Sequence, residues 1–81
     1  MKNKTNRSTL IDALVKQFPV THAMSLLKGS VYECVMLFKV GTGMAKVMEA
    51  ERHLLQSGVE WSEMHILRDR PCVTWQMPAN A

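Results

Sequence analysis

The chain has 81 residues and a mass of 9.2 kDa, which is enough for one small domain and too little for a second hydrophobic core. Its 47% hydrophobic and 21% charged residues are typical of a folded domain and argue against wholesale disorder. The net charge of +3 comes from Lys2, Lys4 and Arg7, because the basic and acidic residues from Ser8 onward cancel. This distribution excludes a uniformly basic, histone-like nucleic-acid binder.

The apolar stretches and the cysteines exclude several other classes of protein. No stretch reaches the roughly 18–20 apolar residues of a membrane-spanning helix. The apolar run Leu10–Val15 is too short for a signal peptide and is broken by Asp12, so we expect a cytoplasmic protein. Cys34 and Cys72 make no disulfide framework and share no metal-ligand spacing with the three histidines, so neither a metal nor a cofactor is expected.

The N-terminal part is predicted to be a flexible basic arm, residues 1–8, followed by helices. Apolar residues at helical spacing predict a first helix over Leu10–Phe18, which Thr9 can cap and Pro19 ends. A second, short helix is predicted over Thr21–Lys28, with a glycine directly after it. We expect no internal repeat.

The next segment allows two interpretations. Apolar residues at i, i+3, i+4 and i+7 between Val31 and Phe38 lie on one face of a helix, and Ser30 with Glu33 matches the S-x-x-E capping box. The alternative is a buried strand over residues 31–40, because this run is rich in β-branched residues and nearly all apolar. The capping box favours the helix.

A longer helix is predicted after a tight turn at Val40–Gly43. Thr42 can cap this helix, residues 43–57, and Gly58 ends it. Glu51 lies in the middle of its apolar stripe. We favour a slight rotation that leaves Glu51 at the edge of the buried face, the alternatives being a basic partner such as Lys16 or a place at a subunit seam.

The C-terminal part is predicted to be a β-hairpin. Apolar and polar residues alternate on either side of a turn at Arg68–Pro71, and residues 78–81 form a frayed tail. The predicted fold is therefore a single domain over residues 9–77, mainly α with a C-terminal β-hairpin. The alternative is an α+β domain with a strand at 31–40.

The order of these elements carries the functional prediction, since no residues suggest a nucleophile with its base and we expect no enzyme. Glu33–Phe38, the Val40–Gly43 turn, the helix from Met44 to Gly58 and the hairpin Met64–Trp75 follow the order of a winged helix-turn-helix. On these segments the chain resembles the small winged helix-turn-helix DNA-binding proteins of bacteria, phages and plasmids. The resemblance implies a transcriptional or mobile-element regulator that binds double-stranded DNA, with a possible homodimer.

The resemblance also implies which residues contact DNA. The helix N-terminus would meet phosphate, the exposed side of the helix would read the major groove, and the wing and arm would contact the backbone or minor groove. The predicted residues are Thr42 at the helix N-terminus; Lys46, Glu49 and His53 on the helix; Arg68 and Arg70 at the wing; and Lys2, Lys4 and Arg7 in the arm. The alternatives for these groups are a solvated helix face, an ordinary polar turn and a solubilising tail.

A second functional prediction belongs to a different class. The chain has seven methionines and two tryptophans, which can furnish an adaptable apolar surface. A small interaction module or inhibitor could bind a host protein through Met44, Met48, Trp61 and Trp75. The alternative for these four residues is the hydrophobic core.

Overall fold

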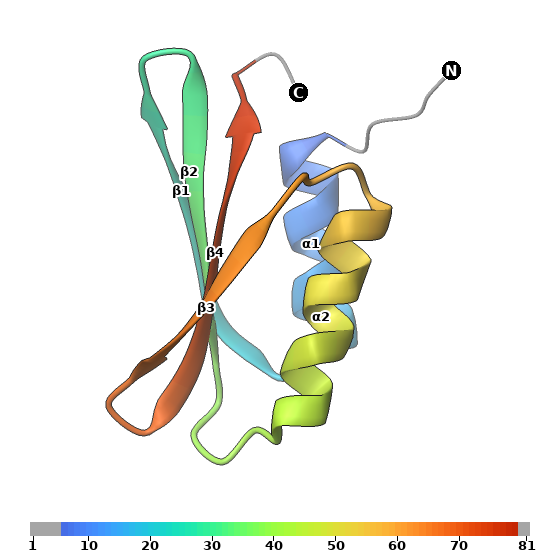
Figure 1. Ribbon diagram of the computed structural model, residues 1–81, viewed down its shortest axis with the longest axis vertical. Coiled ribbons are helices and arrows are strands. Elements are labelled where there is room, and N and C mark those ends of the chain that lie inside the picture. The colour runs from blue at the N-terminus through green and yellow to red at the C-terminus, as the bar shows by residue number, and fades with distance from the viewer. Residues whose placement is uncertain (1–5, 80–81) are drawn as a thin grey trace.

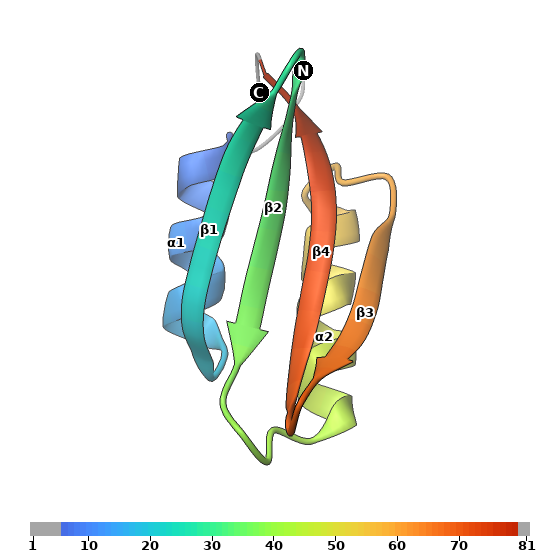
Figure 2. The same cartoon turned by 90° about the vertical axis from the view of Figure 1, so that its left-hand side faces the viewer.

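The computed structural model describes residues 6–79, which form a layer of helices on one face of an antiparallel sheet (Figure 1). The elements in chain order are α1 (Arg7–Gln17), β1 (Val20–Lys28), β2 (Val31–Phe38), α2 (Met44–Gln56), β3 (Ser62–Leu67) and β4 (Arg70–Pro78). The strand order is β1-β2-β4-β3, and both helices lie behind the sheet in Figure 2. The fold is therefore α+β, and the prediction of a mainly α winged helix-turn-helix is wrong.

Helix α1 agrees with the predicted first helix but begins earlier. The Asn6 side chain caps it by accepting a hydrogen bond from the Thr9 backbone N–H at 2.9 Å. Arg7 and Ser8 are therefore helical, so the predicted boundary of the arm at residue 8 is wrong. Lys2 and Lys4 lie outside the described residues.

The largest error concerns β1 and β2, which form a hairpin where two helices were predicted. The turn contains Gly29 in the left-handed region at φ 60°, a conformation that glycine adopts without strain. Glu33 does not cap a helix; its carboxylate pairs with Lys28 Nζ across the hairpin at 3.1 Å. The competing interpretation of residues 31–40, a strand, is the one that forms.

The period of two in β2 explains this outcome. Cys34, Met36 and Phe38 are buried, while the residues between them are exposed or half-buried. The residues at helical spacing were therefore drawn from both faces of a strand. Short apolar runs of this kind fit either structure, and burial against the helices decides between them.

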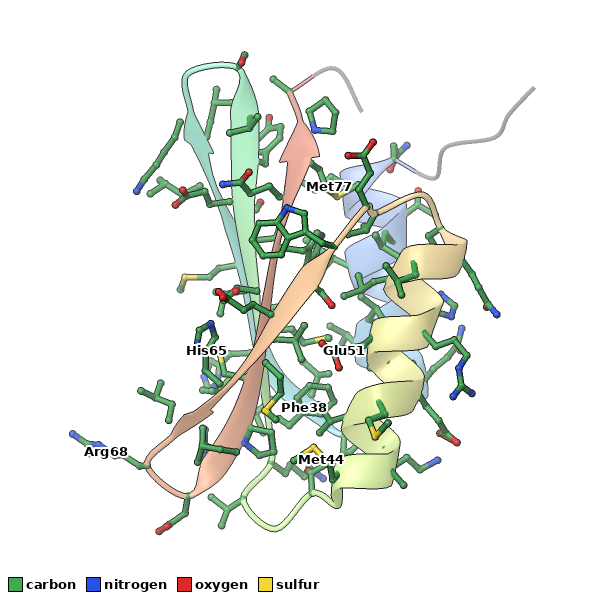
Figure 3. All side chains as sticks on the ribbon, in the orientation of Figure 1. Phe38, Met44, Glu51, His65, Arg68 and Met77 are labelled. Atoms are coloured by element: carbon green, nitrogen blue, oxygen red, sulfur yellow. The ribbon has the colours of Figure 1, made fainter. Side chains whose placement is uncertain are left out.

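The second half of the chain follows the prediction more closely. A helix at Met44–Gln56 and a C-terminal hairpin of β3 and β4 both form. Gly43, and not Thr42, is the N-cap of α2. Glu51 is half-buried and accepts a hydrogen bond from Ser62 Oγ at 2.9 Å, and Figure 3 shows its side chain directed toward the sheet.

The fold contains a repeat that the sequence did not reveal. An α-β-β unit (α1, β1, β2) is followed by a second unit in the same order (α2, β3, β4), and the strand order makes β2 and β4 neighbours at the centre. The left-handed turn residues Gly29 and Arg68 occupy equivalent positions, because in each hairpin the second strand begins two residues after them. The expectation of no internal repeat concerned the sequence, and the two units share little side-chain identity, so the repeat is one of element order alone.

The core is one layer between the sheet and the helices. Figure 3 shows Phe38 and Met77 in this layer, where Phe38 is fully buried. Its buried members are Leu10, Leu14, Cys34, Met36, Phe38, Val47, Ala50, Leu54, Val59, Val73, Trp75 and Met77. Since all the helices of residues 6–79 cover this face, the opposite face of the sheet has no layer over it.

Candidate binding surface on the open face of the sheet

The open face is the set of sheet residues whose side chains point away from both helices. The strand register fixes it, because Met24 lies opposite Val35, Val35 opposite Thr74, and Thr74 opposite Glu63. The face comprises His22, Met24, Leu26 and Lys28 of β1; Val31, Glu33, Val35 and Leu37 of β2; Arg70, Cys72, Thr74 and Gln76 of β4; Glu63, His65 and Leu67 of β3; and Trp61 just before β3. Figure 3 shows His65 on this side of the sheet.

The composition of the open face is unusual for a sheet that meets water. A solvated face of an antiparallel sheet is normally polar, since alternate residues point to opposite sides. Here Met24 is 65% exposed, Leu26 61% and Trp61 52%. Three large apolar side chains gathered on one face form a patch of the kind that marks binding sites.

These side chains enclose a groove of about 440 Å³. Met24 and Leu26 line it from the edge strand β1, and Trp61 and Glu63 line it from the β3 side. The central strands supply Val35 and Thr74 between them. Because the larger side chains stand on the outer strands, the groove follows the two central strands.

The charges around the groove are acidic. Among the described residues that line it are the carboxylates of Glu33 and Glu63, and there is no lysine or arginine. Lys28, outside the groove, pairs with Glu33, and His65 Nε2 lies 3.3 Å from Glu63 Oε1. Both carboxylates are about half exposed, so they can accept a further donor.

The residues in and just before α2 that were predicted to contact the DNA major groove or phosphate do not form a basic surface. Lys46 Nζ forms an exposed ion pair with Glu49 Oε1 at 3.3 Å, so an acidic group lies beside the lysine. His53 is half-buried, with its ring edge-on to Phe18 at a centroid distance of 6.2 Å. The Thr42 hydroxyl donates to the Lys39 carbonyl at 2.8 Å. Each of these side chains has a partner within the fold, although Lys46 and Glu49 are more than half exposed.

The predicted wing residues and Arg7, the one predicted arm residue that the structure describes, lie at opposite ends of the molecule. Arg68 is at the β3–β4 turn, and the Arg70 guanidinium donates to Thr21 Oγ1 at 3.5 Å. Arg7 begins α1 at the other end (Figure 1), where its guanidinium stacks 4.1 Å from the Tyr32 ring centroid and donates to Ser25 Oγ at 2.7 Å. The structure therefore separates Arg7 from Arg68 and Arg70, whereas the β3–β4 turn lies at the same end of the molecule as the start of α2 (Figure 1).

The predicted methionine and tryptophan surface is also divided. Trp75 is 1% exposed and belongs to the hydrophobic core, which was the alternative prediction for this residue. Met44 and Met48 are exposed on α2, in the helical layer, while Trp61 is exposed on the open face. Of these four residues, Trp61 and the buried Trp75 line the groove, and Trp61 is the exposed one.

Sequence reasoning missed Met24, Leu26 and Val35. Their segments were assigned to helices, and in a helix these residues belong to the core. The signal that could have found them is the alternation of β1, where Met24 and Leu26 are separated by a small polar serine. That signal requires knowing first that the segment is a strand.

Both cysteines are buried free thiols. Burial raises the pKa of the Cys34 thiol to about 11, against a smaller opposing effect of Arg7, and burial also raises the pKa of Cys72. Residues 6–79 contain no group of three or more potential metal ligands. Within the same residues, no helix has the length and apolar character needed to cross a membrane.

Comparison with known proteins adds no assignment. No family model, curated protein or solved structure matches this chain. The functional inference therefore depends on the open face and its groove.

Proposed function

We propose that this protein is a small interaction module that binds a partner protein through the open face of its sheet. The observation that carries this proposal is the apolar groove between Met24, Leu26 and Trp61. In a domain this small, every large apolar side chain left in water is unavailable to the core, where it would contribute to stability. A partner that covers the groove would bury these side chains.

Binding of duplex DNA stays a prediction, and the arrangement of charge gives it less support. Binding to duplex DNA depends mainly on lysine and arginine contacts to phosphate. The open face presents two carboxylates in its groove, and Lys46 on α2 is paired with Glu49. A transcriptional role through a protein partner remains compatible with the proposed module.

The experiment is a comparison of three tagged full-length proteins in cells that produce the chain: wild type, Leu26→Glu and Leu55→Glu. Leu55 is a matched control, because it is similarly exposed but lies on α2. A partner that is retained by wild type and Leu55→Glu, and lost from Leu26→Glu, supports the proposal once it binds again as a purified component.

Two results would contradict the proposed function. The first is a set of partners that Leu26→Glu leaves unchanged. The second is salt-sensitive affinity of the purified protein for duplex DNA that falls in Lys46→Ala and Arg70→Ala, which would support the DNA-binding prediction instead.

A further inference from the structure

We infer that the groove on the open face accepts an amphipathic helix that carries lysine or arginine beside its apolar stripe. This inference rests on the proposed function and specifies the partner's chemistry. It follows from the width of the groove, the apolar side chains at its sides and the charge of its lining.

The width of the groove suits a helix. Strands in a sheet are about 4.8 Å apart, so β1 and β3, three spacings apart, are separated by about 14 Å. An α-helix with its side chains is about 10–12 Å across, whereas a single extended strand would leave much of this space empty. A helix along β2 and β4 would contact Leu26 on one side and Trp61 on the other.

The architecture supports the same occupant. The covered face of this sheet already packs two helices through an apolar layer. A helix on the open face would complete a three-layer arrangement with helices on both sides of one sheet, a common solution for burying two apolar faces. Recognition by this mode depends on an apolar stripe at i, i+3, i+4 and i+7 on the partner.

The charges select a basic helix. Glu33 and Glu63 lie on different strands and line the same groove, with no basic residue among the described lining. An apolar helix without cations would desolvate these carboxylates with no new hydrogen-bond donor, which is unfavourable. Lysine or arginine flanking the apolar stripe would pair with them as the groove closes.

The same carboxylates argue against a second copy of this chain as the occupant. Two open faces packed together would bring Glu33 and Glu63 from both copies into one interface. Lys28 already pairs with Glu33, and the described groove lining contains no lysine or arginine to pair with Glu63. A second copy is therefore an outcome that the experiment must be able to detect.

The test uses the full-length protein and two synthetic peptides of about 17 residues, the helical length that matches a strand of eight residues. Both peptides carry the same leucine stripe on an alanine background, and they differ only in lysine or glutamate at the flanking positions. Binding is measured by calorimetry and by the change in tryptophan fluorescence, to which the exposed Trp61 should respond more than the buried Trp75.

The lysine peptide should bind, and the glutamate peptide should bind at least about tenfold more weakly. The double variant Glu33→Gln/Glu63→Gln should lower affinity for the lysine peptide about tenfold, because each exposed charge pair contributes a factor of about three. Leu26→Glu should also lose binding, while Leu55→Glu should retain it. Circular dichroism verifies that each variant is folded.

The outcomes separate this inference from the proposed function. Equal binding of both peptides that Leu26→Glu abolishes would overturn the charge selection and leave the interaction module in place. A second outcome is that wild type binds neither peptide and sediments as a dimer, which Leu26→Glu converts to a monomer. This result would overturn the inference of a helical partner and show that a second copy of the chain occupies the groove. If the protein neither binds a peptide nor self-associates, the inference is overturned, and the groove no longer supports the proposed function.

Discussion

The two faces of the sheet are made by the same four strands and differ in what covers them. On the covered face, Phe38 and Trp75 are fully or almost fully buried beneath α1 and α2. On the open face, Met24 and Leu26 are mostly exposed although they are equally apolar. Stability therefore depends mainly on the covered face, while the open face is the surface on which the proposed partner would bind.

This difference predicts that the same kind of truncation has very different effects on the two faces. Phe38→Ala on the covered face should lower the free energy of unfolding by about 3–5 kcal/mol, because it removes buried contacts and leaves a cavity. Since small domains have only about 5–15 kcal/mol in total, this variant should be largely destabilised. Urea denaturation followed by circular dichroism measures the change, and a loss below about 1 kcal/mol would contradict the assignment of Phe38 to the core.

The two cysteines lie on different faces of the sheet: Cys34 points to the helices and Cys72 to the open face. The pKa of Cys34 is raised from its ordinary value of 9.0 to about 11 by burial, so the folded state keeps a proton that the unfolded state loses. Stability should be unaffected by this thiol below about pH 9 and should fall as pH rises from about 9 to 11. Cys34→Ala should remove part of that decline in denaturation midpoints measured from pH 8 to 11. A wild-type decline that is unchanged in this variant would contradict the assignment.

The hairpin turns belong to neither face and should change stability without changing binding. Arg68 has φ 59°, a left-handed conformation that is strained for a residue with a side chain. Arg68→Gly should stabilise the fold by about 0.5–1 kcal/mol, whereas Gly29→Ala at the equivalent turn should destabilise it by about 1 kcal/mol. Thermal unfolding measures both, and opposite signs are the expected result. A shift of the same sign in both variants would contradict the equivalence of the two turns.

The smallest effect on stability is expected on the open face itself. Leu26→Ser should change the free energy of unfolding by no more than about 0.5 kcal/mol, because the side chain is already mostly in water. The same variant should weaken partner binding, which separates stability from function at one residue. A loss of 2 kcal/mol or more would instead place Leu26 in the core.

The sequence was sufficient to predict α1, α2 and the C-terminal hairpin. In α2 the apolar residues repeat at helical spacing between a glycine-rich turn and Gly58, and β4 alternates clearly from Cys72 to Met77. These patterns fit one type of structure only. In these segments the local sequence was therefore sufficient to predict the secondary structure.

The first hairpin could not be predicted in the same way, because its sequence is apolar on both faces. Met36 points to the core and Val35 to the groove, and no local rule distinguishes them. The S-x-x-E pattern at Ser30 and Glu33 added a false helix signal, whereas the glycine before it forms a β-turn. The error extended to the candidate site, since an exposed apolar sheet face cannot be recognised before its strands are.

The most direct test of the open face as the binding surface is an NMR titration of the isotope-labelled protein with the lysine-containing amphipathic peptide. We predict that the methyl signals of Met24, Leu26 and Val35 and the Trp61 indole signal shift on binding, while the methyl signals of Val15 and Leu55 on the helices stay unchanged. Shifts confined to Val15 and Leu55, with Leu26 and Trp61 unaffected, would contradict it.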